Sequence, residues 1–377
     1  MSNELNQDLV VGLDVGGTRT RAVLAAVGDG RPLGEGVAGP GNALTVPVPQ
    51  LTEHLAEAVG RAVPEGARGR VVAVAGGFAG ATGASPDEPG RLNALAALTA
   101  ALGQLGIATE TVGIHSDIEA AFASAPGAPA DGLALVAGTG AVAARIAERR
   151  CAATVDGDGW LLGDDGSGFW IGRSAVRAAL RMADGRGRPT ALAATVGRAL
   201  GLPEEVLPSG ADVLPSGADV LPYEADVLPY EGAIRYEGAP PYEDVLRYEK
   251  GGAASENWSR ARREAFRMHL LPAVMAQPPI RLARLAPLVA EAAQRDDAVA
   301  GAILDKAADQ LMETIRALEP RPGERIVATG GLLGPDGPLT APLTGRLQTL
   351  GLTLDRVADG CRGAVALARL EHGGGGR

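Results

Sequence analysis

A short unit of apolar strand, glycine-rich turn and returning strand opens both halves of this chain, and it limits the fold more than any other feature. Apolar residues 8–13 lead into the turn Asp-Val-Gly-Gly-Thr at 14–18, after which residues 19–27 alternate back. The same order returns in residues 132–147, around the turn Gly-Thr-Gly at 138–140. Two halves that begin alike indicate an ancient duplication, and 377 residues suit a chain of two domains.

Strand-like and helical segments alternate along the rest of each half, which predicts an α/β fold. Leu51, Leu55 and Ala58, for example, recur at the spacing of one helix face. Further strands are expected at 34–39, 70–75, 111–114 and 325–328, and helices at 51–63, 92–105, 169–183, 303–318 and 363–370. The glycines at the end of the chain predict a flexible tail at 373–377.

Residues 204–250 break this pattern, because a short proline-containing unit repeats there. Asp-Val-Leu-Pro recurs at 212, 219 and 226, and all five tyrosines of the chain lie in the same stretch. Proline recurs too often for a helix, and the units offer little apolar surface to bury. We interpret the segment as a low-complexity, disordered insertion, with a binding module as the alternative. It holds 11 acidic and 3 basic residues, so most of the net charge of −10 belongs to it rather than to the main body.

Several classes of protein do not fit the remaining composition. No basic stripe suggests nucleic-acid binding, and no apolar run reaches the roughly 18 residues of a membrane span. The polar start lacks the pattern of a signal peptide, and two cysteines cannot build a disulfide framework, so a cytoplasmic protein is expected. The two lysines, Lys250 and Lys306, do not follow glycine, which excludes the usual P-loop for ATP.

Glycine-rich turns offer another way to hold phosphate, since backbone N–H groups can surround the oxygens where no Cβ stands in the way. Three such turns each follow a strand: Gly16-Gly17-Thr18, Gly138-Thr139-Gly140 and Gly330-Gly331. Asp14 precedes the first turn by two residues, where its carboxylate could hold Mg²⁺ directly or through water. The three turns together predict a site for a nucleotide and a divalent cation.

Four segments resemble, in order, the signatures of the actin-like ATPase and hexokinase superfamily. They are Val-Gly-Leu-Asp-Val-Gly-Gly-Thr-Arg-Thr at 11–20, Leu-Val-Ala-Gly-Thr-Gly at 135–140, Gly-Trp-Leu-Leu-Gly-Asp-Asp-Gly-Ser at 159–167 and Ala-Thr-Gly-Gly at 328–331. The chain is most similar to the N-acetylglucosamine kinases, which are grouped with the BadF/BadG/BcrA/BcrD-type ATPases. The resemblance covers nearly all of the chain except 204–250 and the termini.

This resemblance implies a two-lobed, ribonuclease H-like α/β fold with ATP between duplicated domains. Residues 1–115 would form the N-terminal lobe, and 116–356 the C-terminal lobe. A helix at 357–372 would pack back on the first lobe.

The resemblance also assigns roles to particular residues. The ATP-binding residues would be Gly16, Gly17, Thr18, Gly138, Thr139, Gly140, Gly330 and Gly331. The sugar-binding residues would be Asn42, Asp117, Gly157, Gly159 and Asp164. Asp14 would serve the Mg²⁺ ion, and Asp117 would be the catalytic base that accepts the proton of a sugar hydroxyl.

Each polar member of this set also has a purely structural interpretation. Asp117 could cap the helix that it opens, Asn42 could be a turn residue after Pro-Gly, and Asp164 could cap or solvate its loop. The aromatic residues nearby are expected in the core: Trp160, Phe169 and Trp170. Two positions depart from the kinase pattern, since Ala141 replaces a usual serine and Asp158 a frequent aromatic residue. Asp158 could favour a free 2-amino group, because an ammonium would pair with its carboxylate.

Three other functions are weighed against a kinase. A dinucleotide oxidoreductase needs a helix after its Gly-x-Gly turn, yet the residues after Gly140 alternate like a strand. An ATPase that activates an acyl-CoA reductase or dehydratase would gather cysteines around an iron–sulfur cluster, whereas Cys151 and Cys361 are far apart in sequence. A sugar-responsive repressor would need a DNA-binding helix pair before the first strand.

We therefore expect an ATP- and Mg²⁺-dependent kinase that phosphorylates N-acetylglucosamine on its 6-hydroxyl, giving N-acetylglucosamine 6-phosphate. Glucosamine or another hexosamine is the alternative substrate, and the ATPase activator is a further one. The expected partner is a small amino sugar rather than nucleic acid or membrane, and a homodimer is left open.

Overall fold

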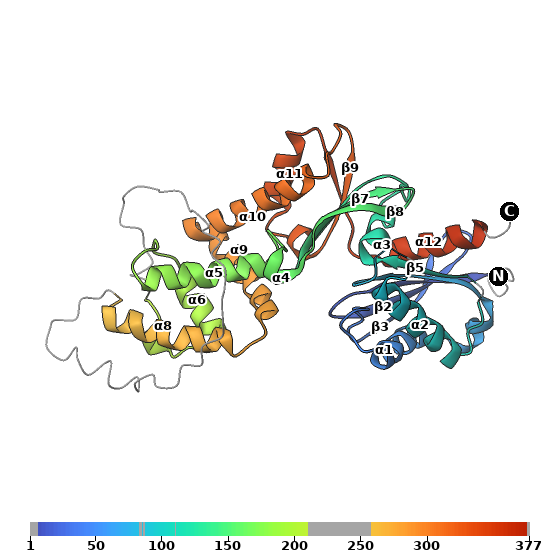
Figure 1. Cartoon of the computed structure of the whole chain (residues 1–377), viewed down its shortest axis with the longest axis horizontal. Coiled ribbons are helices and arrows are strands. Elements are labelled where there is room, and N and C mark those ends of the chain that lie inside the picture. Colours follow the sequence, from blue (N-terminus) through green and yellow to red (C-terminus); the bar gives the residue numbers. More distant parts are fainter. Residues whose placement is uncertain (1–6, 83–84, 86, 110, 210–257, 375–377) are drawn as a thin grey trace. The chain divides into compact units, whose positions relative to one another are not determined.

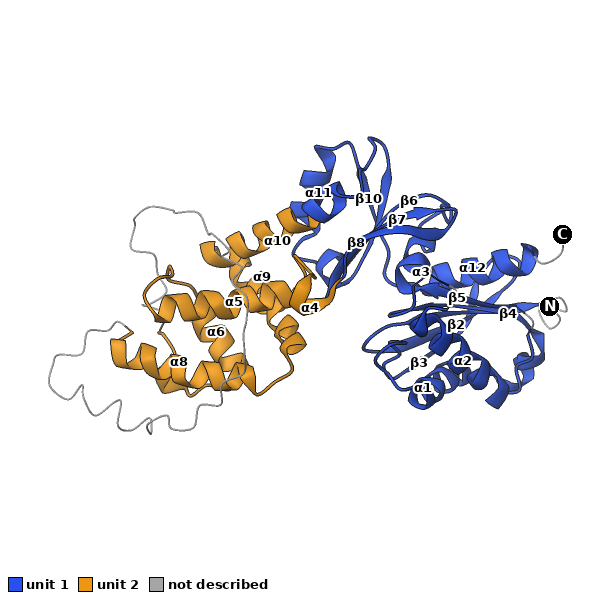
Figure 2. Ribbon diagram, in the orientation of Figure 1, with its two compact units in different colours: residues 1–157, 312–377 blue, residues 158–311 orange. Residues whose placement is uncertain are grey.

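The computed structural model describes residues 7–82, 85, 87–109, 111–209 and 258–374. The chain divides into two compact units (Figure 2): Met1–Gly157 with Met312–Arg377, and Asp158–Leu311. Most of the predicted insertion at 204–250 and the end of the predicted tail lie outside the described residues. Within those residues, no helix combines the length and the apolar character needed to cross a membrane.

The first unit contains a five-stranded sheet with the strand order β3-β2-β1-β4-β5 (Figure 1). Its strands are β1 (Leu9–Val15), β2 (Thr20–Ala26), β3 (Pro32–Ala38), β4 (Val71–Phe78) and β5 (Thr111–Ser116). The first three strands form an antiparallel meander, and β4 and β5 run parallel to β1. The carboxyl ends of β1, β4 and β5 therefore lie along one edge of the sheet.

Helices cover both faces of this sheet, which is why β1 is buried along almost its whole length. Helices α1 (Val48–Ala62) and α2 (Pro89–Gln104) bury their apolar side chains with Leu13, Leu24 and Val74 on one face. Helix α12 (Cys361–Gly374) packs on the other face through Val365 and Leu367. A Cβ at Gly12 would come within 2.5 Å of the backbone nitrogen of Val365, so glycine lets α12 lie directly on β1.

A second five-stranded sheet of the first unit has the order β10-β9-β6-β7-β8 and repeats the topology of the first. Its strands are β6 (Gly132–Ala137), β7 (Ala141–Ala147), β8 (Arg150–Asp156), β9 (Arg325–Thr329) and β10 (Thr353–Arg356). Again a three-stranded meander is extended by two strands parallel to its first strand. The predicted α/β class and the predicted duplication are confirmed by this repetition.

Helix α3 (Asp117–Ala123) joins the two sheets, since it follows β5 directly and packs on the second sheet. Its Ile118 and Phe122 are buried with Ala134, Ile146 and Val327 of that sheet. A short 3₁₀ segment η1 (Glu65–Arg70), a 3₁₀ turn η6 (Gly331–Leu333) and helix α11 (Thr340–Gln348) complete this unit.

All elements of the second unit are helical within the described residues. They are α4 (Gly159–Leu162), α5 (Gly168–Ala183), α6 (Leu192–Ala199), η2 (Glu204–Val206), α8 (Arg260–Met275), η5 (Pro279–Leu285), α9 (Ala286–Gln294) and most of α10 (Ala298–Arg316). Phe169 and Trp170 on α5 are buried, as predicted. The prediction for Trp160 is wrong: its side chain is 37% exposed on the short helix α4, although its ring packs in a tilted arrangement on Phe169, at 5.7 Å between ring centroids.

Candidate functional site

The carboxyl edge of the first sheet brings together polar residues that are far apart in sequence. Val15, Phe78 and Ser116 lie in register on β1, β4 and β5. Asp14 is therefore the second-last residue of β1, and Asp117 directly follows the end of β5. Asp117 contributes to a raised pKa of Asp14, which places the two carboxylates within electrostatic range of each other.

Asp117 does not cap its helix, so the structural interpretation offered for it is wrong. Ser116 is the N-cap of α3, and its side chain accepts a hydrogen bond from the backbone nitrogen of Glu119 at 3.2 Å. Asp117 is the first helical residue, and its Oδ1 accepts from the backbone nitrogen of Ile118 at 2.9 Å. Burial raises the pKa of Asp117, and the nearby Glu119 raises it further. Among the described residues, no side chain forms a hydrogen bond with this carboxylate that would compete with a ligand.

Glu119 fixes the start of α3 through hydrogen bonds of its side chain. Its side chain completes a capping box by accepting from the backbone nitrogen of Ser116 at 3.0 Å. The same carboxylate accepts from the backbone nitrogen of Cys151 on β8 at 2.8 Å, so it ties α3 to the second sheet. Burial acts to raise the pKa of Glu119, but its hydrogen bonds with His115, Cys151 and Ser116 outweigh burial and lower it.

His115 continues this buried network towards the C-terminal helix. Its Nε2 lies 2.9 Å from a carboxylate oxygen of Glu371 on α12, and its Nδ1 lies 3.1 Å from a guanidinium nitrogen of Arg150. Burial acts to lower the pKa of His115, but hydrogen bonds with Glu119 and Glu371 outweigh burial and raise it. The helix that carries Asp117 is thus held by both sheets and by α12.

Asp14 has a second acidic neighbour that the sequence did not indicate. Ligand atoms of Asp14, Asp359 and Cys361 lie within 4.8 Å of one another, beside the start of α12. Burial raises the pKa of Asp14 to about 6, and the charge of Asp359 adds to the effect. Arg21 on β2 pairs with Asp359 at 2.5 Å and partly offsets this acidity.

This donor set suits a hard cation such as Mg²⁺ through its oxygens rather than its sulfur. Two adjacent carboxylates offer oxygen ligands, and a divalent cation would relieve their repulsion. Burial, together with Asp359 and Asp14, raises the pKa of the Cys361 thiol, so the thiol stays protonated and is a poor metal ligand. The thiol of Cys151 has a raised pKa as well, chiefly from burial.

The first glycine turn leaves its tip open. Gly16 donates its N–H to the carbonyl of Arg19 at 2.9 Å, which closes the turn between β1 and β2. Gly17 and Thr18 are exposed, and a Cβ on Gly17 would meet nothing within 4 Å. Packing within the protein therefore does not require glycine at 17, whereas a ligand that approaches the backbone would.

The other two glycine turns lie side by side at the carboxyl edge of the second sheet. Gly138 donates to the carbonyl of Gly140 at 2.9 Å, and Thr139 is exposed at the tip of this β6–β7 turn. Gly330 follows β9 with a φ of +105°, and a Cβ there would come within 2.2 Å of the carbonyl oxygen of Ala137. A Cβ on Gly331 would meet nothing within 4 Å. The edge thus presents backbone N–H groups with space in front of them, as a phosphate requires.

The structural interpretation of Asn42 as a turn residue holds for the oxygen of its side-chain amide. Its Oδ1 accepts from the backbone nitrogens of Leu44 and Thr45 at 2.9 and 3.1 Å, which makes it a turn residue. The turn is tied to the same sheet edge, since Ala43 donates to the carbonyl of Ala79 just beyond β4. The amide nitrogen of Asn42 remains available as a donor there.

The remaining sugar-binding candidates are divided between the two units. Gly157 ends the first unit, has a φ of +82° and lies against Val142. Gly159 and Asp164 belong to the second unit, where Asp164 is buried between α4 and α5 with a φ of +58°. Asp158 is exposed and its side chain caps no helix. Each of these roles stays a prediction.

Two repeated sheets, each a meander with two added parallel strands and a glycine turn at its carboxyl edge, define the two-lobed actin-like ATPase class. The chain matches the BadF/BadG/BcrA/BcrD ATPase family over residues 11–341, so it belongs to that family, and the resemblance seen in the sequence is confirmed.

Solved structures of similar fold span nearly the whole chain. One is the "Putative N-acetylglucosamine Kinase" of Chromobacterium violaceum, with 20% identity, a TM-score of 0.61, and coverage of 96% of this chain and 99% of that chain. Another is the "Putative N-acetylglucosamine Kinase" of Porphyromonas gingivalis, with 18% identity, a TM-score of 0.61 and the same coverage. No curated protein matches the chain.

Proposed function

We propose that this protein is an ATP-dependent kinase that phosphorylates the 6-hydroxyl of N-acetylglucosamine to give N-acetylglucosamine 6-phosphate. The observation that carries the proposal is the position of Asp117. Its carboxylate lies at the same sheet edge as Asp14, does not cap helix α3 and has a raised pKa. The residue that we assign as the base would therefore stand at the same sheet edge as Asp14, whose carboxylate would hold Mg²⁺ together with that of Asp359.

The residues at the sheet edge have separate roles in the proposed phosphoryl transfer. Asp117 accepts the proton as the sugar hydroxyl attacks, and the backbone N–H of Ile118 donates to its carboxylate and keeps it in place. Ser116 and Glu119 cap the helical turn that carries both residues. The amide of Asn42 donates to the sugar. The exposed turns at Gly17 and Thr139 donate N–H groups to the phosphates, which requires no lysine.

Magnesium would be held by Asp14, with Asp359 next to it, directly or through water. When bound, the ion supplies positive charge that neutralises the phosphate oxygens. Arg21 holds Asp359 in position for this arrangement.

Replacement of Asp117 by Asn tests the assignment of the base. The amide keeps the shape but cannot accept the proton, so we expect kcat for N-acetylglucosamine to fall about 10²- to 10⁴-fold. Binding of ATP should change less than about twofold, because the nucleotide would be held by the glycine turns. A coupled assay of ATP consumption and a nucleotide titration measure the two effects.

The matched control is Asp8→Asn, an exposed aspartate at the beginning of the first sheet, which should keep full turnover. Turnover retained in the Asp117→Asn variant would remove Asp117 as the base. An inactive wild-type chain across a panel of hexoses and hexosamines would remove the kinase proposal itself.

Glucosamine is the second candidate substrate, and the exposure of Asp158 favours it. The carboxylate is free to meet an ammonium group, where an aromatic side chain would instead cover an N-acetyl group. The same assay separates the two, because a higher kcat/KM for glucosamine than for N-acetylglucosamine would make glucosamine the substrate.

A further inference from the structure

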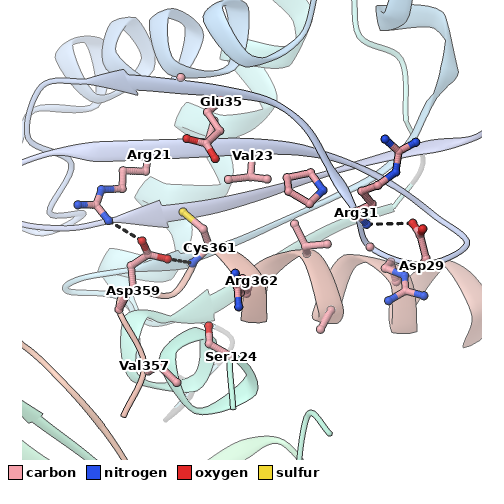
Figure 3. Close-up of a pocket in the computed structure, with 18 of the residues that line it drawn as sticks. Arg21, Val23, Asp29, Arg31, Glu35, Ser124, Val357, Asp359, Cys361 and Arg362 are labelled. Atoms are coloured by element: carbon pink, nitrogen blue, oxygen red, sulfur yellow. Dashed lines mark hydrogen bonds and ion pairs between the residues drawn. The ribbon is translucent and has the colours of Figure 1, made fainter. Parts of the chain in front are cut away.

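A cavity of about 810 Å³ lies in the first unit (Figure 3). Strands β2 and β3 form one wall, the first half of α12 forms another, and the segment after β10 closes one end. None of the predicted ATP-binding glycines lines it. It is therefore distinct from the glycine turns proposed for the phosphates, although Asp359 of the proposed Mg²⁺ site lines it as well.

Positive charge dominates the lining of this cavity. The charged residues are five arginines, Arg21, Arg31, Arg356, Arg362 and Arg369, and three acids, Asp29, Glu35 and Asp359. Some of these charges already serve the fold. Arg21 pairs with Asp359, and Arg369 donates to the backbone carbonyls of Val27 and Gly28.

Two of the five arginines do not take part in such structural contacts. Arg356, at the end of β10, and Arg362, in the first turn of α12, are exposed and form no hydrogen bond or ion pair within the described part of the chain. The positive end of the α12 dipole lies beside Arg362 and adds to the attraction for an anion. Planar guanidinium groups bind phosphate oxygens in pairs, which makes a phosphate group the best match.

The rest of the lining suits a polyhydroxylated carbon skeleton attached to that phosphate. Val23 and Glu35 are direct cross-strand neighbours on β2 and β3, and their side chains lie next to each other in Figure 3. Glu35 is exposed and offers a carboxylate to hydroxyl donors. Val23, Val37 and Val365 supply apolar surface for C–H groups. A guanidinium pair, a carboxylate and an apolar floor together suit a sugar phosphate better than a bare anion.

We propose that this cavity is a second binding site, which takes a sugar phosphate with its phosphate paired to Arg356 and Arg362 and its hydroxyls directed to Glu35. The choice of a sugar phosphate as the class rests on the proposed function, since such a compound is the product of that reaction. The cavity also reaches Asp359, which connects it to the edge that carries Asp14.

Calorimetric titration of the full chain tests the site directly. The protein is first saturated with Mg²⁺, a non-hydrolysable ATP analogue and N-acetylglucosamine, so that the catalytic edge is filled. N-acetylglucosamine 6-phosphate is then titrated in one arm and inorganic phosphate in the other. We expect the sugar phosphate to bind with one further site per chain, and phosphate to bind at least about tenfold more weakly.

Variants assign that binding to the cavity. Arg356→Gln and Arg362→Gln should each weaken the sugar phosphate at least about tenfold, as expected for loss of a charge-assisted hydrogen-bond pair. Glu35→Gln should weaken the sugar phosphate and leave inorganic phosphate unchanged. Arg316→Gln, an exposed arginine at the end of α10, is the matched control and should bind like the wild type.

The outcomes separate this site from the catalytic proposal. Sugar phosphate that binds equally well to the two arginine variants, or does not bind at all, overturns the second site. Phosphate that binds as tightly as the sugar phosphate overturns the assignment to a sugar. Loss of kinase turnover in the wild type would overturn the proposed function, while the titration of the cavity would still report binding.

Discussion

At the scale of single residues, the balance between burial and hydrogen bonds sets the direction in which the pKa of each carboxylate of the site shifts. Asp14, Asp117 and Glu119 are all removed from water, and burial raises the pKa of each. Glu119 accepts two backbone hydrogen bonds and contacts His115, so its pKa falls below the ordinary value. The two aspartates also accept backbone hydrogen bonds, but burial outweighs these bonds, so their pKa values stay raised, which suits a base and a metal ligand.

The raised pKa of Asp14 predicts that the wild type is less stable than a neutral variant at pH 7.5. A carboxylate whose pKa rises from 3.8 to about 6 on folding binds protons more tightly in the folded state. Its contribution to stability is therefore lost as the pH rises from about 4 to about 6. Asp14→Asn should raise the free energy of unfolding at pH 7.5 by at most about 3 kcal/mol, with no gain near pH 4. Urea unfolding at both pH values measures this.

Magnesium provides the internal control for that experiment. The ion should raise the thermal midpoint of the wild type, because it binds the folded carboxylate pair, and should leave Asp14→Asn unchanged. An Asp14→Asn variant that is less stable than the wild type at pH 7.5 would contradict the repulsion between Asp14 and Asp359.

The sequence indicates Asp14 and Asp117 but gives no sign of Asp359. Asp14 follows an apolar strand and precedes a glycine turn, and Asp117 follows another strand, so local patterns point to both. Asp359 becomes part of the site only because α12 lies across β1. That contact depends on the close approach at Gly12, and no short-range pattern encodes it.

At the scale of elements, the first turn of α3 is the part on which the proposed chemistry depends. Ser116 and Glu119 cap each other, and Glu119 also binds the backbone of β8. The turn is thereby fixed to both sheets.

Removal of the cap should therefore affect both stability and catalysis. Ser116→Ala removes the acceptor for the backbone nitrogen of Glu119 and should cost about 1 kcal/mol of stability. Because the turn also orients Asp117, we expect kcat to fall about tenfold. Ser116→Thr, which retains a hydroxyl cap, should restore both values. Thermal unfolding and steady-state kinetics check the two effects.

Ser259→Ala is the matched control, since Ser259 caps α8 of the second unit in the same way. It should lose similar stability at unchanged kcat. An equal loss of kcat in both variants would mean that the cap acts through general stability rather than through the position of Asp117.

Long periodic elements were predictable, while short and exposed ones were not. The predicted strands and helices of the first half match β1 to β5, α1 and α2. On α2, Leu98 and Leu102 are buried, whereas Leu92 and Leu95 are exposed. Strand β8 was missed because most of its side chains are exposed and show no alternation. Its position is set by pairing with β7 rather than by its own pattern.

At the scale of the whole molecule, one topology used twice explains why the glycine turns fall where they do. In each sheet a hairpin turn lies at the carboxyl end of the first strand, and a parallel strand ends beside it. Duplication therefore supplies two exposed glycine turns at once, and in our proposal these turns take the place of a P-loop lysine.

The helical second unit contains the predicted insertion, and its flanks are held together by described residues. Trp258 donates its indole N–H to the carbonyl of Val206 at 2.9 Å, and Arg262 donates to the carbonyls of Glu205 and Leu207. Trp258 is buried against Phe266. These hydrogen bonds thus hold η2 and the start of α8 together, whatever the length of the chain between them.

Our interpretation of residues 204–250 as a disordered insertion predicts that most of it is dispensable. Replacement of 210–250 by a four-residue Gly-Ser linker should keep kcat and KM within about twofold. A shorter flexible connection costs less closure entropy, so the thermal midpoint should rise by about 1–3 °C. Trp258→Ala in the full chain is the contrasting variant and should lower the midpoint markedly, because a buried aromatic contributes about 3–5 kcal/mol. Scanning calorimetry and the coupled assay measure both. Lost turnover with an unchanged midpoint in the shortened chain would instead make the repeat a binding module.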